Sequence, residues 1–79
     1  MKVEIYTKDN CPYCVQAKTL LKSKGIEFTE NHISADTREM LIEQLTQRLG
    51  QTPRTVPQIF MDDQAIGGYT DLVQWFKKQ

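Results

Sequence analysis

The sequence predicts an α/β domain built on a small mixed sheet, and three observations lead to this prediction. Short runs rich in β-branched residues alternate with segments of helical periodicity, in the order βαβαββα. A helix between the first two strands favours a right-handed parallel crossover. Only the dipeptide Asp62-Asp63 separates the last two strands, which favours an antiparallel hairpin. At 79 residues, one domain covering residues 1–79 is expected.

The first half of the chain is expected to hold two strands and one helix. Residues 2–7 alternate between apolar and polar side chains, which predicts a strand. A helix is predicted from about residue 12 to residue 24, with Val15 on its apolar side. Gly25 suits the position just after this helix, where a left-handed backbone is common. Residues 26–33 alternate again and predict the second strand.

The second helix is predicted over residues 37–49. Leucines recur every four residues along it and form one apolar stripe. Asp36 is followed three positions later by Glu39, and this pair resembles a capping box in which aspartate replaces serine or threonine. The helix is therefore expected to begin with a side-chain cap and to end before Gly50.

The last third of the chain is expected to form a hairpin and a helix. Residues 56–61 predict a third strand with a proline near its beginning, one of the few strand positions that proline tolerates. Residues 64–66 predict a short fourth strand. The final helix, over about 71–78, is expected to be capped by Thr70 or Asp71. The complete prediction is a four-stranded mixed sheet flanked by three helices.

Composition excludes several function classes. The formal net charge is zero with 25% charged residues, so no global field attracts nucleic acid or a membrane surface. The apolar runs are a few residues long, far short of the roughly 20 needed to span a bilayer. The first residues lack the apolar core of a secretory signal. A reducing cytoplasm is therefore the expected compartment.

The chain has two cysteines, Cys11 and Cys14, and their spacing indicates chemistry. A bridge between them would close a tiny loop and constrain the unfolded chain little. The remaining readings are redox chemistry and metal binding. A structural zinc site needs four ligands, and only His32 and scattered carboxylates remain to complete one. No metal site is expected, and redox chemistry is favoured.

The predicted helix start gives the two thiols different roles. Cys11 falls at the N-cap, where free backbone N–H groups and the helix dipole favour a thiolate. Lys8 lies three residues upstream and adds positive charge if the loop folds back. In such surroundings a thiol pKa falls from about 8.5 to roughly 3.5–7.5. Cys11 is the expected nucleophile, and Cys14, one turn into the helix, is placed to resolve a mixed disulfide on it.

Three short motifs together resemble the dithiol glutaredoxins. They are "CPYC" at 11–14, "TVPQIF" at 55–60 and "IGGYTDL" at 66–72. Their order and spacing follow that family over essentially the whole chain. The resemblance implies a thioredoxin-like fold, which agrees with the βαβαββα order. It also implies that the second and third motifs bind glutathione.

The resemblance further assigns glutathione contacts to individual residues. It implies a cis peptide bond between Val56 and Pro57, facing the cysteines, with the Val56 backbone pairing to the glutathione peptide. It implies that the γ-glutamyl end of glutathione lies against Thr70 and Asp71. The glycines before them then allow close approach of the backbone to the ligand.

The glycyl carboxylate of glutathione needs a cation. Lys8 matches the family position, and a second cation is expected among Arg38, Arg48 and Arg54, of which Arg54 lies nearest to the "TVP" motif. The complete set expected to bind glutathione is Lys8, Tyr13, Arg54, Thr55, Val56, Pro57, Gly68, Thr70 and Asp71.

The resulting prediction is an enzyme, a glutathione-dependent oxidoreductase that reduces protein disulfides and glutathione mixed disulfides. No tightly bound cofactor is expected, because glutathione serves as a reducing co-substrate. A monomer is expected, with disulfide or glutathionylated proteins as clients, and ribonucleotide reductase is a candidate client. Two alternatives stay open: a redoxin reduced by thioredoxin reductase, and a glutathione-ligated iron–sulfur carrier. Pro12 argues against the carrier, since most such relatives have Gly or Ser there.

Overall fold

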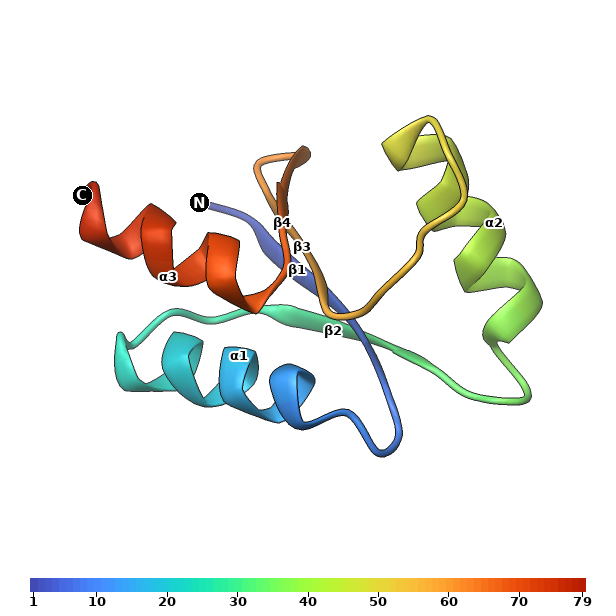
Figure 1. Cartoon of the computed structure of the whole chain (residues 1–79), viewed down its shortest axis with the longest axis horizontal. Coiled ribbons are helices and arrows are strands. Elements are labelled where there is room, and N and C mark those ends of the chain that lie inside the picture. Colours follow the sequence, from blue (N-terminus) through green and yellow to red (C-terminus); the bar gives the residue numbers. More distant parts are fainter.

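The computed structural model describes residues 1–79 and contains one four-stranded sheet with the order β2-β1-β3-β4. Helices α1 and α3 cover one face of the sheet, and α2 covers the other (Figure 1). The elements are β1 (Val3–Lys8), α1 (Pro12–Ser23), β2 (Thr29–Ile33), α2 (Arg38–Leu49), β3 (Gln58–Met61), β4 (Gln64–Gly67) and α3 (Tyr69–Lys77). This is the predicted thioredoxin-like fold. None of the three helices has the length and apolar character needed to cross a membrane.

The strand pairing confirms both predicted connections. β1 pairs in parallel with β2 and antiparallel with β3, and β3 pairs antiparallel with β4. Asp62 and Asp63 both have positive φ, 50° and 68°, which is the backbone of a type I′ hairpin turn. Asp62 also ties the turn to the N-terminus, because its carboxylate accepts a hydrogen bond from the backbone N–H of Lys2 at 2.8 Å.

Two apolar cores lie on the two faces of the sheet. The core under α1 and α3 joins Val3, Ile5, Ala17, Leu21, Ile59, Met61 and Leu72. The core under α2 joins Tyr6, Ile33, Leu41, Leu45 and Phe60. β1 contributes to both cores because it lies inside the sheet and is covered on both faces. The end of β1 is thereby held firmly where the cysteine loop begins.

Two predicted strands are longer than the observed ones. The second strand begins at Thr29 instead of residue 26, and the third begins at Gln58 instead of residue 56. Ile26 and Phe28 pack against the core under α1 and α3 from outside the sheet. At residues 26–28 the alternation of apolar residues therefore indicated side chains that pack against the core, and not a strand paired in the sheet.

Val15 was expected on the apolar side of α1, and this was wrong, since its side chain is 59% exposed. The predicted end of the same helix is confirmed. The N–H of Ile26 donates to the carbonyl of Leu21, and Gly25, at φ 69°, donates to Lys22, both at 3.0 Å. These two bonds form the Schellman ending.

The predicted cap of α2 is wrong, whereas at α3 the Asp71 side chain does cap the helix, although from its third position and not from its start. Thr37, and not Asp36, precedes α2, and its hydroxyl accepts from the N–H of Ser34 at 2.9 Å and donates to the carbonyl of His32 at 2.8 Å. Thr37 therefore organises the turn before α2 instead of capping the helix. At α3 the N-cap residue is Gly68, and the Asp71 carboxylate accepts its N–H at 2.9 Å.

Candidate active site

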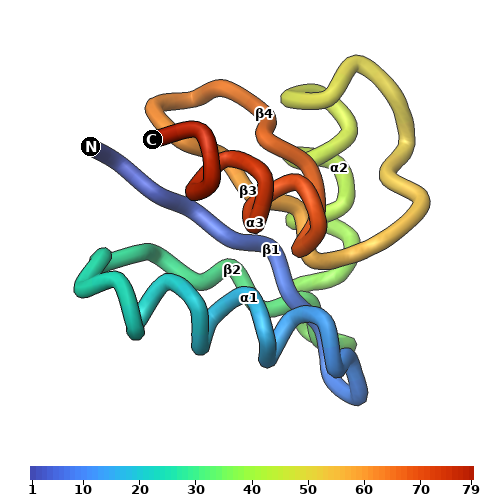
Figure 2. The backbone as a smooth tube through the Cα atoms, turned by 60° about the vertical axis from the view of Figure 1, so that its left-hand side comes forward, coloured from blue at the N-terminus to red at the C-terminus, as the bar shows by residue number.

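The two cysteines lie at the junction of β1 and α1, as predicted, and they form a disulfide with a Cα–Cα distance of 5.2 Å. Asn10 makes the turn into the helix with a left-handed backbone at φ 54°. Figure 2 shows β1 running from the end of the molecule that carries both termini toward this loop at the opposite end. The pair thus lies at the carboxyl end of the central parallel strand, where α/β folds commonly place their sites.

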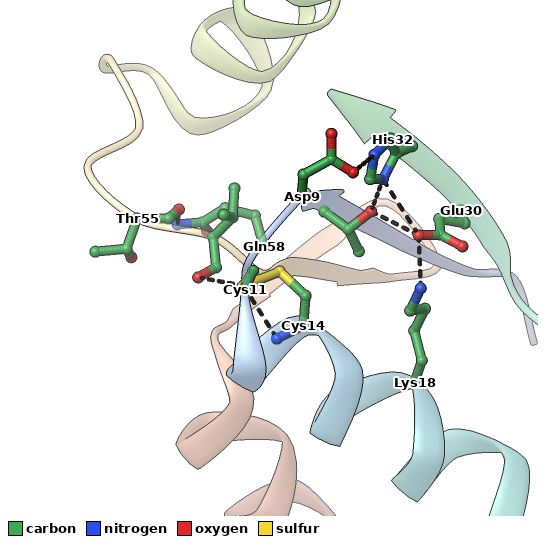
Figure 3. The surroundings of a disulfide bond; sticks show 10 residues. Asp9, Cys11, Cys14, Lys18, Glu30, His32, Thr55 and Gln58 are labelled. Carbon is green, nitrogen blue, oxygen red and sulfur yellow. Dashed lines mark hydrogen bonds and ion pairs between the residues drawn. A yellow bond between two sulfur atoms is a disulfide. The ribbon is translucent and has the colours of Figure 1, made fainter. Parts of the chain in front are cut away.

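The two sulfur atoms differ in access and in hydrogen bonding. Cys11 is the N-cap of α1, and its Sγ accepts the backbone N–H of Cys14 at 3.1 Å. The Sγ of Cys11 also lies 3.7 Å from the carbonyl oxygen of Val56 (Figure 3). Cys11 retains 9% exposure and Cys14 only 2%. Cys11 is therefore the more exposed residue of the pair, and its sulfur already receives the N–H donor that stabilises a thiolate.

The segment opposite the disulfide has the backbone that the family resemblance implied. The peptide bond between Val56 and Pro57 is cis. The side-chain amide of Gln58 donates to the carbonyl of Thr55 at 2.8 Å and holds the segment to the beginning of β3. The Val56 carbonyl therefore faces the Cys11 sulfur from a fixed position.

A groove of about 460 Å³ lies beside this segment, between the end of β1 and the beginning of α2. Lys8, Arg38 and Arg54 supply three cations to it. Its other lining residues are Asp9, Ile33, Ser34, Ala35, Ile42, Pro53, Thr55 and Val56. An anionic ligand with an apolar portion is what such a lining accepts. The sequence indicated Lys8, Arg54, Thr55 and Val56 and named Arg38 as a candidate cation, but did not indicate Asp9.

Arg48, the third candidate arginine, lies elsewhere. Its guanidinium donates to both Glu4 carboxylate oxygens at 2.8 and 3.0 Å and to the Tyr6 hydroxyl at 2.9 Å, and it lies 3.9 Å from the centroid of the Phe60 ring. The Arg48 hydrogen bonds hold the pKa of Glu4 below its usual value, and the bond to Glu4 raises the pKa of Arg48 further. This side chain attaches α2 to the sheet and does not reach the groove.

The start of α3 forms the neighbouring corner. A Cβ added to Gly68 would lie 3.5 Å from the carbonyl oxygen of Pro57, so the backbone there approaches the cis-proline segment closely. Tyr13, 60% exposed, stacks on Tyr69 with ring centroids 6.0 Å apart. Thr70 is exposed, and Asp71 holds the N–H of Gly68. These residues gather at one corner of the site, and their binding of glutathione stays a prediction.

A chain of polar contacts, not anticipated from the sequence, runs beside the disulfide (Figure 3). Lys18 donates to Glu30 at 2.9 Å, and the buried Thr7 hydroxyl donates to the same Glu30 oxygen at 2.6 Å. Nδ1 of His32 lies 3.0 Å from the Thr7 hydroxyl, and its Nε2 lies 3.0 Å from the Asp9 carboxylate. The hydrogen bond from Thr7, with help from Lys18, lowers the pKa of Glu30.

Comparison with known proteins agrees with this geometry. The family profile described as Glutaredoxin matches residues 3–66. Glutaredoxin 3 of Escherichia coli strain K12 is 53% identical over 70 residues, covering 89% of this chain and 80% of that protein. The crystal structure of Francisella tularensis glutaredoxin 1 complexed with cacodylate superposes with a TM-score of 0.81 at 40% identity, covering 98% and 93% of the two chains. A buckwheat glutaredoxin–glutathione complex superposes with a TM-score of 0.79 at 26% identity, covering 96% and 68%.

The family profile alone covers well over half of the chain, and the paired cysteines occur in the fold that the family uses. A pair of thiols that closes into a disulfide within one helical turn can pass two electrons to a substrate disulfide. On both grounds the chain belongs to the glutaredoxin family, as a dithiol thiol–disulfide oxidoreductase.

Proposed function

We propose that the protein takes its electrons from glutathione and uses them to reduce protein disulfides and protein–glutathione mixed disulfides. The observation that carries this proposal is the groove beside Cys11, which presents three cations next to an extended backbone segment. Glutathione is a short peptide with two carboxylates, one ammonium and one thiol. Its thiol must reach Cys11 while its charged ends find partners, and the groove and the start of α3 supply them.

The glycyl end of glutathione is assigned to the groove. Its carboxylate binds Lys8 together with Arg38 or Arg54, all of which line the groove. The peptide pairs with the backbone of Val56 in the manner of an added strand. The buckwheat relative, whose structure is a complex with glutathione, supports this class of ligand.

The γ-glutamyl end is assigned to the start of α3. Its carboxylate binds the backbone N–H groups of the first helical turn, with Gly68 and Thr70 beside it. Its ammonium binds the Asp71 carboxylate, of which one oxygen already accepts the Gly68 N–H. Tyr13, held against Tyr69, borders the ligand on the solvent side.

The proposed reaction begins at Cys11, whose thiolate is stabilised by the N–H of Cys14 and by the helix start. With a glutathionylated protein, Cys11 attacks the glutathione sulfur, and the protein leaves as a thiolate that takes up a proton. A second glutathione thiolate then attacks the glutathione sulfur bound to Cys11. Glutathione disulfide leaves, and Cys11 is again a thiolate.

With a protein disulfide, Cys14 is required. Cys11 attacks one substrate sulfur and forms a mixed disulfide, and the Cys14 thiolate then attacks the Cys11 sulfur. The reduced protein leaves as a dithiol, and the Cys11–Cys14 disulfide remains. One glutathione opens that disulfide by attack on Cys11, and a second one releases glutathione disulfide.

The decisive experiment couples turnover to NADPH consumption through glutathione and glutathione reductase, and in parallel through thioredoxin reductase. We expect activity in the first assay only. Cys11→Ser is expected to abolish activity on both substrate classes, whereas Cys14→Ser retains activity on a glutathionylated peptide and loses activity on a protein disulfide. Efficient reduction by thioredoxin reductase without glutathione would reject the proposal, and complete loss of deglutathionylation in Cys14→Ser would reject the cysteine roles.

The proposal extends to the setting in which the enzyme works. A glutathione-reduced enzyme needs a reducing compartment, which is the cytoplasm. We expect a monomer with disulfide-containing or glutathionylated protein clients, among which ribonucleotide reductase is a candidate. Sedimentation at micromolar concentration tests the monomer. Disulfide trapping of clients on Cys14→Ser tests the client set, since this variant accumulates the mixed disulfide at Cys11.

A further inference from the structure

His32 lies at the centre of the polar chain, on the edge strand β2. The register of the sheet places it beside Thr7 of β1, and the Asp9 side chain turns back from the loop after β1 to meet its outer nitrogen. The imidazole is 41% exposed, and the Asp9 carboxylate is 80% exposed. The contact therefore joins β2 to the segment that carries Lys8 and leads to Cys11.

The hydrogen bonds require a proton on each ring nitrogen of His32. Thr7 has one hydroxyl proton, and it points to the Glu30 oxygen at 2.6 Å, because a carboxylate can only accept. The Thr7 oxygen must therefore accept from Nδ1 of His32 at 3.0 Å. The Asp9 carboxylate likewise can only accept, so Nε2 of His32 donates to it at 3.0 Å.

A neutral imidazole would break one of these two contacts. With its proton on Nδ1, a lone pair on Nε2 faces the Asp9 carboxylate. With its proton on Nε2, a lone pair on Nδ1 faces a Thr7 oxygen whose proton is already used. The complete chain of contacts thus contains the imidazolium form.

Asp9 also lines the groove that is assigned to the glycyl carboxylate of glutathione. It is the one acidic side chain in a lining that carries three cations. We propose that protonated His32 is a positioning residue for glutathione, because it binds and neutralises Asp9 and so keeps an opposing charge from the anionic end of the ligand. This inference rests on the proposed glutathione function.

Loss of the His32 proton to solvent then weakens the binding of glutathione in the groove. Whichever nitrogen keeps the remaining proton, the Asp9 charge is then no longer offset, and it repels the anionic end of the ligand. The charged groups around the imidazole come from three elements: Asp9 in the loop after β1, Lys18 of α1 through its bond to Glu30, and Glu30 of β2 itself, 3.7 Å from Nδ1. Glu30 keeps Lys18 and Thr7 as partners throughout, so Asp9 is the carboxylate that loses its compensating charge.

Binding of S-methylglutathione to the reduced protein tests the inference, because this probe cannot react. Dissociation constants are measured by amide chemical shifts at about pH 5.5 and about pH 7.5, on either side of the ordinary histidine range. In wild type we expect binding about threefold weaker at the higher pH, the size expected for one charge near the surface. Asp9→Asn is expected to bind tightly at both values, and His32→Gln weakly at both.

Two further variants make the test specific. His32→Arg keeps a charge and two donors at every pH, so it is expected to restore tight binding without the pH dependence. Glu27→Gln removes one negative charge from an exposed position before β2 and is expected to behave as wild type. In turnover of a glutathionylated peptide, His32→Gln is expected to raise KM about threefold and to leave kcat unchanged.

The outcomes separate the two proposals. Absence of binding by wild type at both pH values would reject the glutathione function, and this inference with it. Binding whose pH ratio is the same in wild type and Asp9→Asn would reject the role of His32 alone. Ring nitrogen resonances of His32 that do not move in Asp9→Asn would reject the contact itself.

Discussion

Replacing Arg48 by methionine separates structural from ligand-binding arginines, and its effect can be worked from the contacts. Methionine keeps an apolar side chain at this position but removes the guanidinium from the Phe60 ring, together with two hydrogen bonds to Glu4 and one to Tyr6. Glu4, whose side chain is 12% exposed, then keeps only Lys2 at 3.9 Å as a cation. The Glu4 carboxylate, which is largely buried, is thus left with one distant cation.

The expected cost lies between two limits. An exposed ion pair contributes about 0.5 kcal/mol, and breaking a buried pair costs about 4 kcal/mol. Because the two side chains are 12% and 20% exposed, we expect a loss of about 2–3 kcal/mol in the free energy of unfolding. For a chain of this size that lowers Tm by about 10–20 °C. The total free energy of unfolding is about 4–12 kcal/mol, so the variant still folds.

The assay compares three variants by urea unfolding and by KM for glutathione. Arg48→Met is expected to unfold at lower urea with unchanged KM. Arg38→Met and Arg54→Met, both exposed, are expected to change the unfolding free energy by less than about 0.5 kcal/mol. Replacing the one that binds the glycyl carboxylate in the proposed glutathione complex is expected to raise KM about threefold to tenfold. An Arg48→Met protein with raised KM and unchanged stability would refute the assignment.

Three further predictions concern the fold around the site. The pKa of Glu4 is lowered in the folded state, so its contribution to stability is present above the ordinary carboxyl pKa and is lost as the pH falls through the folded value. Glu4→Gln is therefore expected to lower the urea midpoint at neutral pH. The urea midpoint of this variant is also expected to fall less than that of wild type when the pH is lowered. Gly67→Ala, at φ 119° with a Cβ colliding with the Asp71 carboxylate, is expected to cost about 1–3 kcal/mol by urea unfolding, against about 1 kcal/mol for Gly50→Ala, which has open space. Leu45→Ala is expected to cost about 2–4 kcal/mol by thermal unfolding, since this residue of α2 is fully buried against the sheet.

Much of the fold could be predicted from the sequence, because turns and helix ends are set by residues that are neighbours in the chain. The Asp62-Asp63 turn needs residues that tolerate positive φ, and both the turn and the antiparallel pairing are present. The predictions were wrong where a contact with a residue distant in the sequence determines the local structure. Val15 is apolar at helical spacing, yet nothing packs over that side of α1. Asp36 has the chemistry of a cap, but Thr37 reaches back to the strand before it and displaces the helix start.

The predicted topology could have shown which arginine of the second helix lies near the cysteines. β1 and β2 run parallel, so a helix that follows β2 begins near the carboxyl end of β1, where the cysteines lie. Ten residues along that helix span about 15 Å, which carries Arg48 back toward Glu4 near the beginning of β1. Arg38 in the first turn was therefore the better candidate from this helix.

The contact between His32 and Asp9 could not be reached by the same route. It depends on the register that pairs Thr7 with His32, and a shift of one residue would turn the imidazole to the opposite face, under α2. Nothing in the local sequence fixes that register; it follows from which side chains of β2 enter the core, and Ile33 is the buried one. Once Ile33 points to α2, His32 and Glu30 must point to α1, and the buried hydroxyl of Thr7 must find its partners among them. A polar residue buried in the central strand beside a catalytic loop is thus the signal that leads to such a contact, because its hydrogen bonds have to be satisfied by side chains on the neighbouring strand.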